Sequence, residues 1–285
     1  MSKKKLNDKK DYNYFKEKKE KNWEKLYWAI DLHHTVITGT YNRFNTGATI
    51  YPYAKEVLDF LKKHKEVDVF CLQEIWQGGE EKAREWSENM DTTMFDGISD
   101  VLPEYTGYFR PHWGDFFGLA IFVKKNLNLK EEGEVFVFRN KENIHDAWSS
   151  KHPRNLQYVT IETPSGLRTI LNLHGLWTGK DKDDNEDRII QSKNILAFIK
   201  NISNPVILCG DFNLSPETKS LKMFTESGLR DLINEFGITS TRSSHYKKPV
   251  KFADYVFVSK EIEINDFKVL PDEVSDHLAL IVDFN

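Results

Sequence analysis

The feature that most constrains this chain is a series of short apolar runs, rich in Val, Ile, Phe, Tyr and Thr and bounded by Gly, Pro, Asn or Asp. Such runs predict β-strands, and they occur at residues 35–41, 67–73, 118–123, 135–138, 157–162, 167–174, 206–210, 253–258 and 278–282. Helical spacing of apolar residues occurs singly between them, at 52–65, 80–89, 187–199 and 219–227. Because strands dominate, we expect an α/β fold in which two sheets pack face to face and helices cover the outer faces.

The first 25 residues differ from the rest in charge. They carry ten lysines against five acids, a net +5, and since the whole chain carries −4, the remaining 260 residues carry −9. We therefore divide the chain into a Lys-rich tail or helix at residues 1–29 and one catalytic domain at residues 30–285. No apolar run approaches the ~20 residues of a membrane span, and no signal peptide is visible. We expect a cytoplasmic monomer in which Cys71 and Cys209 are buried and reduced.

Several predicted strands begin or end in polar residues that are costly to bury without a partner. These residues are Asn42, Glu74, Asn172, His174, Asp211, Asn213, Asp254, Asp276 and His277. Side chains alternate along a strand, so two residues separated by one position share a face. Each residue alone is more typical of a turn, a cap or the surface. Together, carboxylates, amides and histidines at so many strand ends favour a hard-cation site for phosphoester chemistry.

The order of these segments resembles a known family. TYN, LQE, NLH, GDFN, DY and SDH follow one another from about residue 36 to residue 283 as they do in the endonuclease/exonuclease/phosphatase superfamily, the deoxyribonuclease I-like metal-dependent phosphoesterases. GDFN followed by SDH is the most specific part of the pattern. The resemblance implies a four-layered αββα sandwich with two mainly antiparallel sheets, and hydrolysis of a phosphoester with Mg²⁺, or with Mn²⁺ as the alternative ion.

The resemblance also implies a metal site. Glu74 would be the principal Mg²⁺ ligand and Asn42 would lie beside it. Asp276 would be a nearby carboxylate that either binds the metal or supports the ligands. A cation held in this way neutralises charge on the phosphoryl oxygens and on the leaving group.

Five further residues receive catalytic roles from the same resemblance. Asp211 would orient and deprotonate the attacking water, and Asn213 would position that water and bind the phosphoryl group. His277 would contact a phosphoryl oxygen while Asp254 holds its ring. His174 would supply a second phosphate contact.

Four substrate-binding candidates have competing interpretations. Asn172 could bind substrate or make a structural hydrogen bond inside the site. Arg154 precedes a strand and could face phosphate, or it could lie on the surface. Arg110 and Trp113 belong to the largest predicted loop, residues 76–117, where aromatic residues could stack on bases, line a headgroup pocket or pack in the core. Residues 139–156 and 175–187 are the other large loop candidates.

Two patterns that look like metal sites are interpreted otherwise. Residues 181–186 are acidic but lack the Gly and the Glu of a calcium loop, so they predict an acidic helix N-terminus. His33 and His34 are adjacent, and adjacent side chains in a strand point in opposite directions.

The substrate is the part that the sequence specifies least. A nucleic-acid phosphodiesterase or endonuclease is favoured by the basic tail, although the acidic domain does not look built to grip long nucleic acid. The alternative within the same superfamily is a phosphatase or a phosphodiesterase of phospholipids or small molecules. An alternative of another class is a non-catalytic binding module with the same fold.

Overall fold

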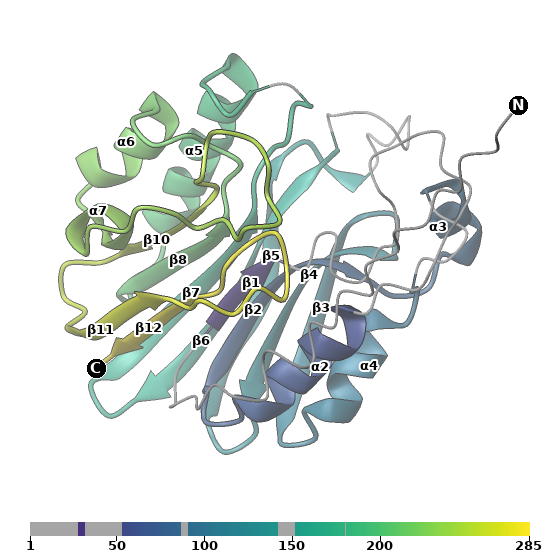
Figure 1. Ribbon diagram of the computed structural model, residues 1–285. Helices are drawn as coiled ribbons and strands as arrows, with labels where there is room; N and C mark the ends of the chain where they lie inside the picture. The colour runs from purple at the N-terminus through teal and green to yellow at the C-terminus, as the bar shows by residue number, and fades with distance from the viewer. Residues whose placement is uncertain (1–27, 32–52, 87–90, 142–151, 180) are drawn as a thin grey trace, which may run out of the picture.

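The structure is a computed structural model that describes residues 28–31, 53–86, 91–141, 152–179 and 181–285 (Figure 1). The strand predicted at 35–41, the pair His33 and His34, and the metal-ligand candidate Asn42 therefore lie outside the described residues. In the described ranges, no helix is long and apolar enough to cross a membrane.

The first sheet has the strand order β11-β12-β1-β2-β4-β3. These strands are Ile264–Val269 (β11), Leu280–Phe284 (β12), Trp28–Asp31 (β1), Val69–Trp76 (β2), Phe117–Lys124 (β4) and Tyr105–Trp113 (β3). The pair β1 and β2 is parallel, and the other neighbours are antiparallel. The sheet is therefore mainly antiparallel, as expected.

The second sheet has the strand order β5-β6-β7-β8-β10-β9. Its strands are Asn128–Phe138 (β5), Arg154–Thr163 (β6), Gly166–His174 (β7), Val206–Asp211 (β8), Asp254–Val258 (β10) and Arg230–Asp231 (β9). Only β7 and β8 are parallel among the pairings described here. This parallel step brings the carboxyl ends of β7 and β8 to the same edge of the sheet.

Helices cover the outer face of each sheet (Figure 1). They are Tyr53–Lys63 (α2), Glu80–Trp86 (α3) and Met94–Val101 (α4) on the side of the first sheet, and Glu186–Ile199 (α5), Lys219–Glu226 (α6) and Leu232–Glu235 (α7) on the side of the second. Apolar residues of α2 and α4 pack in one core cluster with β2 and β4. A second cluster joins the inner faces of both sheets and the helices over the second sheet. The predicted four-layered αββα sandwich is confirmed.

The main error of the sequence-based prediction is the loop at residues 76–117. The helix predicted at residues 80–89 is present as α3, but α4 and the nine-residue strand β3 lie where the sequence predicts only a loop. β3 lies at the edge of its sheet and pairs only with β4 among the described strands, and most of its residues are partly exposed. Pro111 is tolerated there because an edge strand needs fewer ladder hydrogen bonds. A partly exposed edge strand with Gly107 and Pro111 lacks the apolar alternation that reveals other strands.

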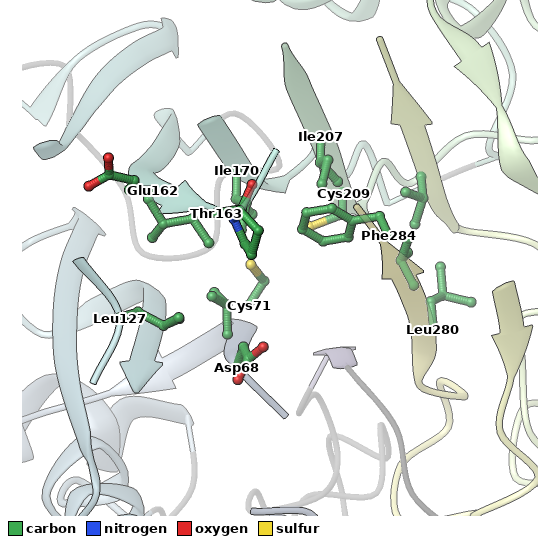
Figure 2. Close-up of a pocket in the computed structure, with 15 residues that line it drawn as sticks. Asp68, Cys71, Leu127, Glu162, Thr163, Ile170, Ile207, Cys209, Leu280 and Phe284 are labelled. Atoms are coloured by element: carbon green, nitrogen blue, oxygen red, sulfur yellow. The ribbon is translucent and has the colours of Figure 1, made fainter. Parts of the chain in front are cut away.

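A cavity of about 180 Å³ lies between the two sheets near the start of β2 and β8 (Figure 2). Cys71 and Cys209 line it from opposite sheets, and both are buried and unbridged, as predicted. A hydrogen bond with the Cys209 thiol and burial raise the pKa of Cys71 well above its ordinary value. Cys71 is therefore a protonated, unreactive thiol at neutral pH.

Candidate active site

Strand register places three of the predicted catalytic side chains in a row. β7 and β8 pair so that His174 lies beside Asp211, and β8 and β10 pair so that Asp211 lies beside Asp254. Residues opposite one another on neighbouring strands point to the same face of the sheet. All three side chains are buried. We call His174, Asp211 and Asp254 the catalytic row. They lie side by side at one end of the second sheet, although they are far apart in sequence.

His277 joins this row from the connection that precedes β12. Its Nδ1 atom lies 2.8 Å from Oδ1 and 3.0 Å from Oδ2 of Asp254. A proton on Nδ1 donated to that carboxylate leaves Nε2 facing Asp211, whose Oδ2 atom is 3.9 Å away. That separation is too long for a hydrogen bond, so the two groups face the same space without being bonded to each other.

The GDFN segment, residues 210–213, forms a tight turn that contains Asp211. Oδ1 of Asp211 accepts a hydrogen bond from the backbone N–H of Asn213 at 2.6 Å, and Asn213 has a φ of +53°. Gly210 has a φ of +133°, and a Cβ atom there would lie 2.0 Å from the carbonyl oxygen of Leu173. Only glycine fits so close to the neighbouring strand. The turn fixes the carboxylate of Asp211 at the end of β8.

Glu74 reaches the same region from the first sheet. The register of β2 against β4 shifts between Leu72 and Ile75, and Glu74 in this irregular stretch has a φ of +59°. Bulges of this kind redirect side chains, and left-handed backbone at a non-glycine residue is typical of functional sites. The carboxylate is mostly buried, and its Oε1 atom lies 3.5 Å from Nε2 of His174. Glu74 and the row of the second sheet thus face each other across the sandwich.

Asn172 holds the two sheets together behind these residues. Its Oδ1 atom accepts a hydrogen bond from Gln73 Nε2 at 2.6 Å, and its Nδ2 atom donates to the carbonyl oxygen of Leu72 at 3.0 Å. The side chain is fully buried. These contacts match the structural interpretation that the sequence left open for Asn172. They position Glu74 and His174, which lie one and two residues further along their strands.

Asp276 is held by a partly buried ion pair. Its Oδ2 atom accepts a hydrogen bond from Arg242 Nη1 at 2.7 Å, and the backbone of Arg242 pairs with that of His277. The carboxylate is thus oriented by a residue that the sequence analysis missed. Arg242 stands in a polar segment without strand or helix periodicity, so no sequence pattern pointed to it.

The donor set fits a hard cation such as Mg²⁺. Among the described residues, no group of three or more His, Cys, Asp and Glu side chains is arranged around a common metal position. Protein Mg²⁺ sites commonly use only one or two carboxylates, with water and substrate phosphate as the other ligands. The mostly buried carboxylate of Glu74 at the centre of the site meets that requirement.

Arg154 is buried and does not lie on the surface. Its Nη1 atom is 2.8 Å from His112 Nε2, and the ring of His112 lies 6.0 Å from that of His174 in an edge-to-face arrangement. Burial lowers the pKa of His112 well below its ordinary value, and the Arg154 charge acts in the same direction. His112 is therefore a neutral imidazole that can accept a hydrogen bond from Arg154.

Arg110 forms an ion pair, and Trp113 packs in the hydrophobic core. The guanidinium of Arg110 pairs with the carboxylate of Glu132 on β5. Trp113 is buried and packs edge-to-face against Trp76 and Phe117 in the core of the first sheet. The core-packing interpretation is therefore the one that Trp113 matches.

The acidic run at residues 181–186 caps helices, as predicted. Asn185 is the N-cap of α5, and Asp184 accepts hydrogen bonds from the backbone at the start of α6. Arg188, in the first turn of α5, is buried and donates to the carbonyl oxygens of Leu176 and Asn213. It ties the connection after β7 to the GDFN turn. Its position in a helix gave no sign of this role.

The fold is the αββα sandwich of the deoxyribonuclease I-like class. The sequence model of the Endonuclease/Exonuclease/phosphatase family matches residues 43–277, and the chain belongs to this family. The activities in the family's name all cleave phosphoester bonds. A search of curated proteins finds no match.

Solved structures of the same fold include three that show its range. The mannosyl-6-phosphatase Bt3783 of Bacteroides thetaiotaomicron VPI-5482 is 18% identical with a TM-score of 0.63, covering 82% of this chain and 90% of its own. The catalytic domain of human nocturnin with bound sulfate is 21% identical with a TM-score of 0.57, covering 82% and 85%. D. rerio TDP2 humanized by 14 mutations is 14% identical with a TM-score of 0.62, covering 92% and 98%.

Proposed function

We propose that this protein is a Mg²⁺-dependent phosphoester hydrolase, with Mn²⁺ as the alternative ion, whose catalytic domain spans residues 30–285. The observation that carries the proposal is the line from Asp254 through His277 to Asp211. One carboxylate contacts Nδ1 of the histidine, and the other faces Nε2 across 3.9 Å. Hydrolysis of a phosphoester requires a base that accepts a proton from the attacking water and a hydrogen-bond donor to the phosphoryl group, and Asp211 and His277 face the same space in these two roles.

Asp211 is the group that activates water in this proposal. Its Oδ1 atom is engaged by the backbone N–H of Asn213, which leaves Oδ2 on the side of His277. A carboxylate held in one orientation can accept the proton of a water aligned for attack on phosphorus. The amide of Asn213 lies in the same turn and supports the position of that water.

His277 stabilises negative charge that develops on the phosphoryl oxygens. The carboxylate of Asp254 holds the ring through Nδ1, so that Nε2 points towards the reaction centre and can donate a hydrogen bond there. His174 lies beside Asp211 in the sheet register and adds a second donor on the opposite side.

Glu74 would hold the metal ion, with Asp276 and Asn42 as the other candidate ligands. When bound, the ion neutralises charge on the phosphoryl oxygens and on the leaving oxygen. The left-handed backbone at Glu74 keeps its carboxylate turned towards His174. The carboxylate is thus in place before any substrate enters.

A nucleic-acid phosphodiester is the substrate that we place first. Trp177, three residues after His174, has 37% of its surface exposed. An exposed aromatic ring near a phosphoryl site can stack on a base. The lysines of residues 1–29 would attract the same polyanion, because positive segments raise association rates with nucleic acid.

A phosphomonoesterase that acts on a sugar phosphate is the second candidate. It is favoured by the likeness to a mannosyl-6-phosphatase at a TM-score of 0.63. A sugar ring can also pack on an exposed Trp177, so the aromatic side chain alone does not separate the two candidates.

A substrate panel tests the proposal. Purified protein is assayed with Mg²⁺, with Mn²⁺ and with excess chelator on single-stranded DNA, RNA, duplex DNA, sugar phosphates, inositol phosphates and a phospholipid diester. His277→Ala and Asp211→Asn, purified in parallel, report any contaminating activity. We expect turnover of at least one substrate that needs metal and is lost in both variants. Equal turnover in wild type and His277→Ala, or no turnover of any phosphoester, would contradict the proposal and favour a binding module.

A further inference from the structure

Three cationic side chains surround one tyrosine ring next to the site. The Cζ atom of Arg242 lies 4.3 Å from the ring centroid of Tyr246, and the Nζ atoms of Lys182 and Lys251 lie 5.3 Å and 5.5 Å from it. We call these four residues the cation cluster. The electron-rich face of an aromatic ring attracts cations, and Tyr246 therefore draws together three positive charges that repel one another.

Backbone carbonyl groups hold the two lysines. Lys182 Nζ donates to the carbonyl oxygen of Phe252 at 2.8 Å, and Lys251 Nζ donates to that of Tyr246 at 2.6 Å. In the described part of the chain, neither lysine forms an ion pair with a carboxylate. Both are partly buried. Backbone contacts thus fix two lysine charges in place, and no acid of the described residues neutralises them directly.

The cluster is fixed beside the catalytic row. Arg242 binds the carboxylate of Asp276 and pairs through its backbone with His277. The backbone N–H of Ser243 also donates to the carbonyl oxygen of Asp276 at 3.0 Å. In Figure 1 the connections that precede β10 and β12 accordingly run close together at one end of the sheets.

The electrostatics of Lys182 agree with this location. Burial lowers the pKa of Lys182 to about 8, and the charge of Arg242 acts in the same direction. The carboxylates of Asp211 and Asp254 act in the opposite direction. Lys182 therefore lies within electrostatic range of the catalytic row, and a bound anion would further favour its charged form.

We propose that the cation cluster binds a second phosphate group of the substrate, adjacent to the phosphate that is hydrolysed. This inference rests on the proposed function and narrows its substrate class. A phosphate offers several acceptor oxygens, which Lys and Arg donors bind through charge-assisted hydrogen bonds. An anion between these cations also offsets their mutual repulsion. The second phosphate belongs either to the neighbouring nucleotide of a strand or to a bisphosphorylated small molecule.

Calorimetric binding to the His277→Ala protein tests the subsite without turnover. Two matched pairs of ligands are titrated: thymidine 3′,5′-bisphosphate with thymidine 5′-monophosphate, and glucose 1,6-bisphosphate with glucose 6-phosphate. We expect the bisphosphate of at least one pair to bind roughly tenfold more tightly, as one charge-assisted contact provides. The pair that shows the preference identifies the source of the second phosphate.

Lysine variants in the same background locate the effect. Lys182→Met and Lys251→Met should each remove most of the bisphosphate preference. Lys248→Met changes the same charge at an exposed position of the same connection and should leave the preference intact. Two lysine variants are used so that poor folding of one leaves the other as a test.

Equal affinity for both members of both pairs would overturn the subsite, as would an equal loss of preference in Lys248→Met. Failure of the subsite and failure of the proposed function are distinguishable. Turnover of a phosphoester without bisphosphate preference refutes the subsite alone. A bisphosphate preference without turnover of any phosphoester refutes the hydrolase and leaves a phosphate-binding site.

Discussion

The contact between Asp254 and His277 can be tested by a single change of one atom, Asp254→Asn. His277 Nδ1 lies 2.8 Å and 3.0 Å from the two carboxylate oxygens, and both side chains are buried. A hydrogen bond to a charged partner is worth about 1.5–3 kcal/mol. Each 1.36 kcal/mol corresponds to tenfold in rate, so kcat should fall roughly 10- to 150-fold if the lost contact stabilises only the transition state.

The assay compares wild type, Asp254→Asn, His277→Ala and the double variant on the substrate that the panel identifies. If Asp254 acts through His277, the double variant should be no slower than His277→Ala alone. Asp231→Asn changes the same charge at a helix N-cap outside the site and serves as the matched control. The reasoning is refuted by wild-type kcat in Asp254→Asn, or by a double variant much slower than His277→Ala. Thermal unfolding of each variant confirms that it is folded.

Three further predictions concern the frame of the site. Gly210→Ala should lower the free energy of unfolding by about 2 kcal/mol or more, because its Cβ would lie 2.0 Å from a carbonyl oxygen; urea denaturation measures this, and a loss below ~0.5 kcal/mol would contradict it. Asn172→Ala should cost about 1–3 kcal/mol, because it removes the acceptor of Gln73 Nε2 between the sheets; unchanged urea midpoints would argue against the inter-sheet bond. Folding lowers the pKa of His112, so the unfolded chain binds a proton below about pH 6.5 that the folded chain excludes. The free energy of unfolding therefore decreases as the pH is lowered below that value. His112→Gln should flatten that dependence by up to about 1.4 kcal/mol per pH unit between pH 6.5 and 5, and equal slopes in both proteins would refute the pKa shift.

The sequence predicts the fold where burial on the inner faces leaves a clear pattern. Strands β7 and β8 are almost wholly buried, so they appear as apolar runs with sharp polar ends. Strand β3 does not, because its edge position leaves most residues partly exposed. The short strand β9 has two residues and is too brief for any periodicity to show.

In the candidate site, too, the sequence predicts residues next to buried strands and misses residues in polar connections. Residues at strand ends, such as His174 and Asp211, could be predicted because the ends of buried strands are where polar residues become conspicuous. Arg242 and Lys182 could not, since they stand in polar connections where a charged residue is ordinarily solvated. Their positions depend on how two connections fold against each other, which neither propensity nor periodicity encodes.

The register that aligns His174, Asp211 and Asp254 also makes catalysis a sensitive measure of correct folding. A slip of β10 by one residue would place Ala253 or Tyr255 opposite Asp211 and turn Asp254 to the other face. Such a molecule would retain its strand content and much of its apolar burial, so circular dichroism would scarcely distinguish it. Its turnover would vanish. The active fraction of a preparation, counted by active-site titration, therefore reports how many molecules have the native strand pairing.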